Sequence, residues 1–235
     1  MAASLPARAV AGPHSLTQSR KSSMRYLSLA LLALLLLCGT QPAAAQANGP
    51  TLPLVSPGKP VAGVSQEEWS KRWWRWALSF DDDESPVADR DGRFCTSGQE
   101  GAVWFLAGTY GSSRTIRSCR VPAGKMLFFP LINYITVEPD DEDESCVSLK
   151  QRAARLTPAP DALLLEVNGK RFNGLEAHRQ VTRRCFHISD DDDTMAAGNG
   201  FYVALGPLKK GRYTLNFGGI LPGMSQAVTY TLNVD

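Results

Sequence analysis

The C-terminal part of the chain consists of short segments in which apolar and polar residues alternate, separated by turn residues. FYVAL (201–205) precedes a Pro-Leu-Lys-Lys-Gly turn, RYTLNF follows at 212–217, and AVTYTLNVD (227–235) alternates throughout. A period of two residues is that of a β-strand with one buried face. These segments therefore predict strands, and their close spacing predicts antiparallel pairs.

The middle of the chain carries further strand patterns. AVWFLAG (102–108) and TIRSCRV (115–121) flank a Gly-Ser-Ser turn, and KMLFFPLINYI (125–135) is apolar enough for a strand that is largely buried. Pro130 within that run predicts a bulge, a bend or an edge position, because proline donates no ladder hydrogen bond. LLLEVNGKRF (163–172) predicts a hairpin that turns at Asn-Gly.

Residues 65–80 have the pattern of an amphipathic helix. Ser65 followed by Glu68 is a capping box, and a helix starting there places Trp69, Trp73, Trp76 and Phe80 in one narrow arc, which predicts a buried face. Trp74 lies about 140° from that arc, so it forms either a second packing face or an exposed binding residue. Residues 146–156 fit a second, shorter helix that ends before Pro158.

Short strands outnumber helices, so the sequence predicts a mainly antiparallel β-sandwich, immunoglobulin-like or jelly-roll-like. The tryptophan-rich helix is expected to pack at one end or edge of it. Residues 65–235 are expected to form a single disulfide-stabilised domain. The preceding residues 46–64 are rich in proline and glycine and predict a linker or an extended arm.

The N-terminal 45 residues predict a leader, with a secretory signal peptide at 24–45. Arg25 supplies the positive start, an apolar run of about 11 residues follows, and Ala43–Ala45 fit a cleavage site. That run falls short of the roughly 20 residues that cross a bilayer, and no second one follows it. The mature chain is therefore expected to be periplasmic or secreted, without a transmembrane segment, whether translation starts at Met1 or Met24.

Four cysteines follow the leader, and an even number in an exported chain predicts two disulfides. Local pairing, Cys95 with Cys119 and Cys146 with Cys185, is the pairing we favour, since each bond would join neighbouring segments. A zinc site with His178 or His187 is the alternative, although the sequence has no C-x-x-C pair to support it.

Neither the charge balance of the mature chain nor the export signal favours nucleic-acid binding. Four of the 25 basic residues lie in the leader. The basic residues that remain are fewer than the 23 Asp and Glu, so the mature chain is slightly acidic. The acids gather in runs at 81–84, 140–144 and 190–193, which predict solvated loops or weak Ca²⁺ sites. The best calcium candidates are Asp81, Asp83, Asp89 and Asp91.

Motifs of catalysis are absent. The mature chain has two histidines and neither G-x-S-x-G nor H-E-x-x-H, so serine-hydrolase and zincin mechanisms have no starting point. A pair of carboxylates for glycoside hydrolysis stays open in a chain with so many acidic residues. The sequence therefore predicts no catalytic residue.

Four stretches resemble a family of uncharacterised exported bacterial proteins. They are WSKRWWRWALS (69–79), CTSGQEGAVWFLAG (95–108), CRVPAGKMLFFPLIN (119–133) and the closing GRYTLNF with VTYTLNV. The resemblance implies an exported globular domain and no established activity. Our expectation is a non-enzymatic binding or structural module that uses Trp74 or its loops to hold a protein or glycan. A calcium-stabilised version of that module and a carbohydrate-active enzyme are the alternatives.

Overall fold

Helix α1 (Gln66–Leu78) begins where the capping box predicts it. The computed structural model describes residues 52–110, 114–139, 144–191 and 193–235. In it the Ser65 hydroxyl accepts a hydrogen bond from the backbone N–H of Glu68 at 3.1 Å, a cap typically worth about 1 kcal/mol. Lys71 pairs with Glu67 one turn away at 2.9 Å, on the side of the helix that leaves the tryptophans free to pack.

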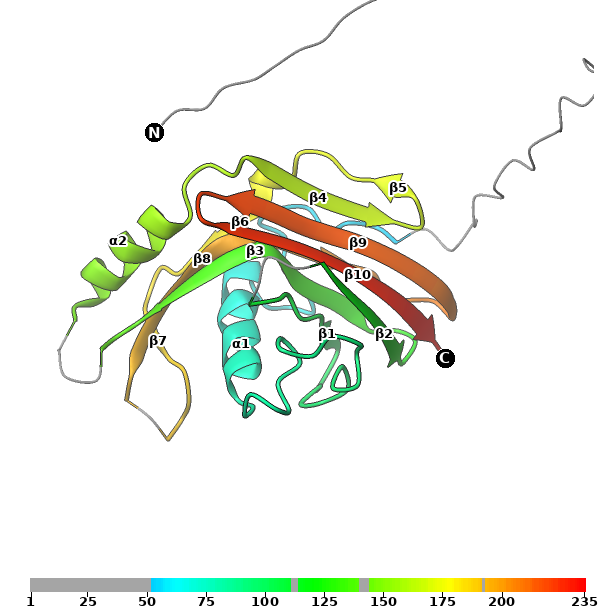
Figure 1. The fold of residues 1–235 in the computed structure, drawn as a ribbon, viewed down its shortest axis with the longest axis horizontal. Helices are drawn as coiled ribbons and strands as arrows, with labels where there is room; N and C mark the ends of the chain where they lie inside the picture. The colour runs from blue at the N-terminus through cyan, green and yellow to red at the C-terminus, as the bar shows by residue number, and fades with distance from the viewer. Residues whose placement is uncertain (1–51, 111–113, 140–143, 192) are drawn as a thin grey trace, which may run out of the picture. The chain divides into compact units, whose positions relative to one another are not determined.

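Within the described residues, ten strands form two five-stranded sheets, which confirms the predicted β-rich sandwich (Figure 1). The first sheet has the order β1-β3-β8-β6, and β7 also pairs with β8. Its strands are β1 (Val103–Phe105), β3 (Met126–Val137), β6 (Arg179–Val181), β7 (Phe186–His187) and β8 (Met195–Leu205). The register shifts between Pro130 and Ile132, so Pro130 lies at a bulge, one of the three positions predicted for it.

The second sheet has the order β2-β10-β9-β4-β5. Its strands are β2 (Thr115–Val121), β4 (Ala162–Val167), β5 (Lys170–Arg171), β9 (Gly211–Leu221) and β10 (Met224–Val234). The β4–β5 hairpin turns at Asn168-Gly169, both with positive φ, as predicted. Two pairs are parallel, β1 with β3 and β2 with β10, so the sheets are mixed in type.

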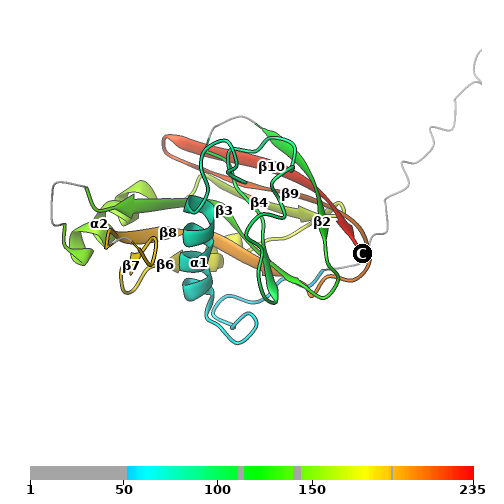
Figure 2. The same ribbon diagram turned by 90° about the horizontal axis from the view of Figure 1, so that it is seen from below.

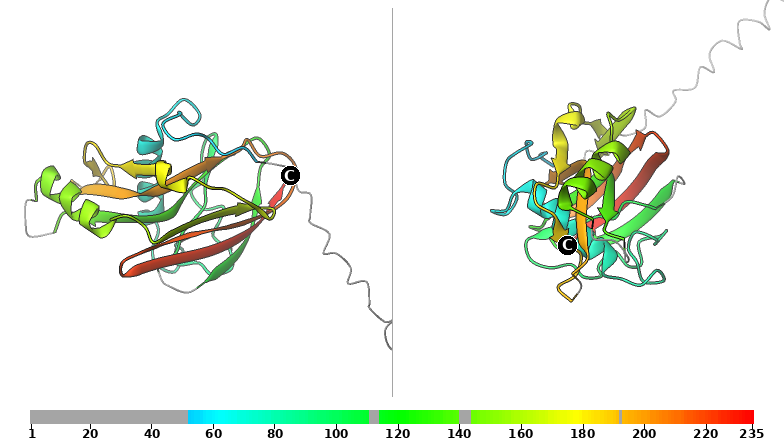
Figure 3. Two further views of the ribbon diagram at one scale, coloured as in Figure 1. Left: turned by 90° about the horizontal axis from the view of Figure 1, so that it is seen from above. Right: turned by 90° about the vertical axis from the view of Figure 1, so that its left-hand side faces the viewer.

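The main core lies between the two sheets, which form two layers (Figure 3, left). Strand β3 is buried on both of its faces, because the second sheet packs on one face and helix α1 packs on the other. Phe129 faces the second sheet and lies 4.5 Å from Phe217 between ring centroids, while Phe128 belongs to a separate cluster under α1. This explains why residues 126–132 are apolar without alternation.

Helix α1 packs on the outer face of the first sheet, so its predicted position at an end or edge is wrong (Figures 2 and 3). Trp73 and Trp76 are buried there, which confirms the core role of the tryptophan arc. The helix covers this face where Gly198 and small alanines on β8 leave room for indole rings.

The remaining elements are short. Helix α2 (Cys146–Leu156) has the bounds predicted for it, and the 3₁₀ helix η1 (Leu175–His178) precedes β6. Residues 52–64 form an arm that packs along β8, where Leu54 bridges to Leu205. No helix in the described part of the chain has the length and hydropathy needed to cross a membrane.

Candidate functional site

A cavity of about 310 Å³ lies where the C-terminal half of α1 meets β3, the segment that follows β1, and the start of β10. We call it the tryptophan pocket. Its larger wall residues are Trp73, Trp74, Leu78, Tyr110, Tyr134 and Ile135. Besides the two tyrosine hydroxyls, the amide and hydroxyl groups in the lining come from Thr109, Asn133 and Gln226. An apolar, aromatic cavity with a few polar groups is the usual composition of a small-molecule site.

Helix α1 fixes two neighbouring indoles in the wall of the pocket. The Trp73 indole N–H donates to the backbone carbonyl of Leu106 at 3.0 Å, so this ring is held both by packing and by a buried hydrogen bond. The Trp73 and Trp74 rings meet edge to face with centroids 5.0 Å apart. The two indoles therefore form a rigid wall.

Trp74 is only 7% exposed, so its predicted role as an exposed binding residue is wrong, and it forms a second packing face instead. Its ring lies on the backbone of β8 at Gly198, where an added Cβ would come within 3.0 Å of the indole nitrogen. That N–H makes no hydrogen bond of normal geometry within the described residues. Trp74 belongs to the candidate site as a buried wall residue.

Two buried polar residues meet beside the indoles. The Asn133 side-chain amide donates to the Tyr202 hydroxyl at 2.9 Å, and both residues are at least 95% buried. Complete burial raises the pKa of Tyr202 well above its ordinary value, so this hydroxyl stays neutral. The pair joins β3 to β8 under the pocket and carries no charge.

Gln226 ties three segments of the pocket together. Its amide nitrogen donates to the carbonyls of Pro130 and Leu131, at 3.1 and 2.8 Å, and its amide oxygen accepts from the backbone N–H of Thr109 at 3.0 Å. These bonds satisfy the carbonyls beside the bulge in β3. They also hold the segment after β1 against β10.

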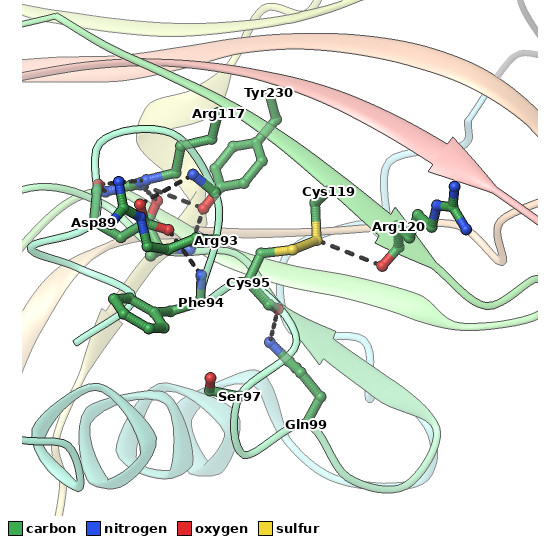
Figure 4. Close-up of a disulfide and its surroundings, with 12 residues drawn as sticks. Asp89, Arg93, Phe94, Cys95, Ser97, Gln99, Arg117, Cys119, Arg120 and Tyr230 are labelled. Atoms are coloured by element: carbon green, nitrogen blue, oxygen red, sulfur yellow. Dashed lines mark hydrogen bonds between the residues drawn. A yellow bond between two sulfur atoms is a disulfide. The ribbon is translucent and has the colours of Figure 1, made fainter. Parts of the chain in front are cut away.

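Beneath the pocket, Arg117 is 1% exposed, and its partners among the described residues are oxygen atoms that do not belong to carboxylates (Figure 4). Its guanidinium reaches the backbone carbonyls of Val87 and Asp89 on one side and of Ala107 and Gly108 on the other, at 2.6–3.0 Å. Val87 and Gly108 also line the tryptophan pocket. Arg117 therefore fixes two walls of the pocket from below.

Sequence reasoning missed Arg117, although the signal was present. Thr115, Arg117, Cys119 and Val121 occupy alternate positions of β2, and all four are buried. Alternate residues of a strand share one face, so an arginine two residues before a disulfide cysteine and four before a valine lies on the buried face. A buried guanidinium needs several acceptors, so this position alone predicts a cluster of backbone carbonyls around it.

The two disulfides join the pairs that local pairing predicts, Cys95 with Cys119 and Cys146 with Cys185. The first joins the loop after α1 to the inner face of β2, two residues from Arg117 (Figure 4). The second joins the start of α2 to the residue before β7. Both cysteine pairs are thus structural, and the zinc alternative does not apply to them.

The predicted calcium ligands do not come together. Asp89 is buried, and its carboxylate accepts from the backbone N–H groups of Asp91, Gly92 and Phe94. Asp91 pairs with the guanidinium of Arg93 at 2.8 Å, which holds the pKa of this carboxyl well below its ordinary value. Asp81 and Asp83 are exposed.

Across the described residues no three His, Cys, Asp or Glu side chains are placed to hold a metal ion, so the site predicted at these aspartates is not assembled. Residues 140–143 and Asp192, in the other acidic runs, lie outside the described residues. The two histidines do not share a site. His178 is buried, whereas His187 is exposed and its ring nitrogen lies 2.9 Å from the carbonyl of Asp193.

Comparisons with protein families, with curated proteins and with solved structures gave no match. The resemblance to exported bacterial proteins therefore stays a prediction.

Proposed function

We propose that this protein is an exported binding module, not an enzyme, and that it holds a small ligand in the tryptophan pocket. The observation that carries the proposal is a cavity of about 310 Å³ with a mainly aromatic and apolar wall. Cavities that bind small molecules begin at about this volume and have this composition. Export is supported by the two disulfides, which persist in an oxidising compartment.

The side chains of the pocket favour binding over catalysis. Among the described residues its lining contains no Asp, Glu, His, Lys, Arg or Cys, the side chains that most often act as general acids, general bases and charged nucleophiles. Asn133 and Gln226 each use their amide to hold other parts of the fold. A lining of this kind supplies shape and apolar contacts to a ligand.

Rigidity also favours binding. Arg117, Gln226 and Trp73 all anchor backbone segments of the walls through buried hydrogen bonds. A cavity that is formed before the ligand arrives avoids the entropic cost of ordering loops and side chains on binding. The proposal therefore expects little change of structure when the ligand enters.

The neutral fluorescent probe N-phenyl-1-naphthylamine tests the proposal. The full chain, exported to the periplasm of a bacterial host and purified with its disulfides intact, is titrated with the probe while energy transfer from tryptophan is recorded. We expect one site with a Kd on the order of 10 µM for a ligand of this size. Absence of binding by the native protein would overturn the proposal.

Two variants locate the site. Ile135→Trp and Met224→Trp fill the pocket from β3 and from β10, and both positions are only partly buried, so each tolerates a larger side chain better than a core position. We expect both to lose the probe. Ile220→Trp is the matched control, because Ile220 is 45% exposed and does not line the pocket. Equal binding by all three folded variants would show that the probe binds elsewhere.

A further inference from the structure

A second cavity, of about 460 Å³, adjoins the tryptophan pocket. We call it the arginine groove, because Arg90 and Arg114 lie in its lining with the exposed Ile116 of β2. Val87, Thr109 and Tyr110 line both cavities, so these three residues are the wall between them. A ligand that passes over this wall contacts both.

The two cavities differ in charge. Among the described residues, the lining of the tryptophan pocket has no charged side chain, whereas that of the arginine groove has two arginines and no acid. Apolar surface favours an apolar body, and guanidinium groups favour carboxylate, sulfonate or phosphate oxygens. The pair of cavities therefore matches a molecule with an apolar part and an anionic part.

Neither arginine has a carboxylate partner in the described part of the chain. Arg90 makes no hydrogen bond or ion pair there, and Arg114 donates to the hydroxyl of Thr229 at 3.2 Å. Elsewhere on the surface Arg72, Arg93 and Arg152 pair with acids. The guanidinium groups of the groove thus keep most of their donors for a ligand.

A third guanidinium lies under the same walls. Arg117 donates to the carbonyl of Val87, which lines both cavities, and no carboxylate within the described residues comes within 4 Å of it. Its positive charge is buried and screened little by solvent. Two acids act near these walls: Asp82, whose charge affects the Tyr110 hydroxyl, and Asp89, whose carboxylate accepts three backbone N–H groups.

Building on the proposed function, we propose that the ligand is a small organic anion, with its apolar ring or chain in the tryptophan pocket and its anionic group held by Arg90 and Arg114. Tyr110 lines both cavities, so it lies between the apolar and the anionic parts of the ligand. Because both arginines are exposed, the charge contribution falls with ionic strength, while the apolar contribution does not.

A matched pair of probes tests the inference. 8-Anilinonaphthalene-1-sulfonate and N-phenyl-1-naphthylamine share one aromatic frame, and only the first carries a sulfonate. At low salt we expect the sulfonate to bind about tenfold more tightly, and we expect that preference to shrink towards unity in 1 M NaCl. Equal affinities at low salt would overturn the inference and leave the proposed binding function standing. Failure of both probes would overturn both.

Variants assign the effect to the groove. The double variant R90Q/R114Q is expected to lose about tenfold in affinity for the sulfonate probe and to bind the neutral probe within about twofold of the native protein. R155Q/R171Q changes the net charge equally at two exposed arginines that line neither cavity. An equal loss in this control would attribute the preference to net charge and overturn the inference.

A vesicle experiment separates a free anion from a lipid headgroup. The native protein is sedimented with phosphatidylglycerol vesicles at low salt. The inference expects the protein to stay in the supernatant, because the apolar part of its ligand fits within a cavity of about 310 Å³. Sedimentation that R90Q/R114Q abolishes would overturn the free-anion form of the proposal.

Discussion

The guanidinium of Arg117 lies 5.6 Å from the ring centroid of Tyr230 and donates to its hydroxyl at 3.3 Å. The same hydroxyl accepts from the backbone N–H of Ala107 at 3.2 Å. Tyr230 is buried in the core between the sheets, and burial raises the pKa of its hydroxyl, which stays protonated. One arginine thus links the sandwich core to the walls of the tryptophan pocket.

Arg117→Met is expected to lower the free energy of unfolding by about 3–5 kcal/mol, because it leaves several buried carbonyls without donors. Arg120→Met, on the same strand but exposed, is the matched control and should change stability by less than about 0.5 kcal/mol. Urea denaturation measures both. Similar losses in the two variants would show that the carbonyl cluster does not depend on Arg117.

Asp89→Ala is expected to cost about 2–4 kcal/mol, since three backbone N–H groups lose their acceptor in a partly buried loop. The loss should be the same in EDTA and in millimolar Ca²⁺, because the carboxylate binds the backbone and not a metal. Asp83→Ala, at an exposed position, should be nearly neutral in both. A loss that appears only with Ca²⁺ would restore Asp89 as a metal ligand.

Gly198→Ala is expected to destabilise the protein by about 1–3 kcal/mol, because its Cβ meets the Trp74 indole. In a Trp74→Phe background the same change should cost at least about 1 kcal/mol less, which a double-mutant cycle measures. Gly200→Ala is the control, since its Cβ meets the backbone of β3 and not the indole. If Trp74→Phe reduced the loss of stability in both glycine variants, a direct contact between residue 198 and the Trp74 indole would be contradicted.

Stability should depend on pH through His178. Burial lowers the pKa of this ring below its ordinary 6.5, so between the two values the unfolded chain binds more protons than the folded one. Its contribution is therefore complete above pH 6.5 and is lost as pH falls below it, with a slope of at most about 1.4 kcal/mol per pH unit. His178→Leu should flatten the slope between pH 7 and pH 5, while the exposed His187→Leu keeps it. Parallel slopes in all three proteins would exclude His178 as the source.

The sequence determines what local chemistry dictates. Ser65 caps α1 because a hydroxyl three residues before Glu68 reaches its N–H, and Asn168-Gly169 turns a hairpin because both residues accept positive φ. Alternation in 227–235 determines which side chains of β10 are buried. These features depend on neighbours a few residues away, so the amino-acid sequence alone is enough to predict them.

The tertiary structure decides what depends on distant neighbours. Gly218 and Gly219 lie inside β9, and the β10 backbone at Gln226 approaches too closely for a Cβ at Gly218. The parallel pairing of β2 with β10 and the burial of Trp74 have the same origin, since each joins residues more than 100 positions apart. The tryptophan pocket exists only where five separate stretches of the chain meet, and no local pattern encodes that meeting.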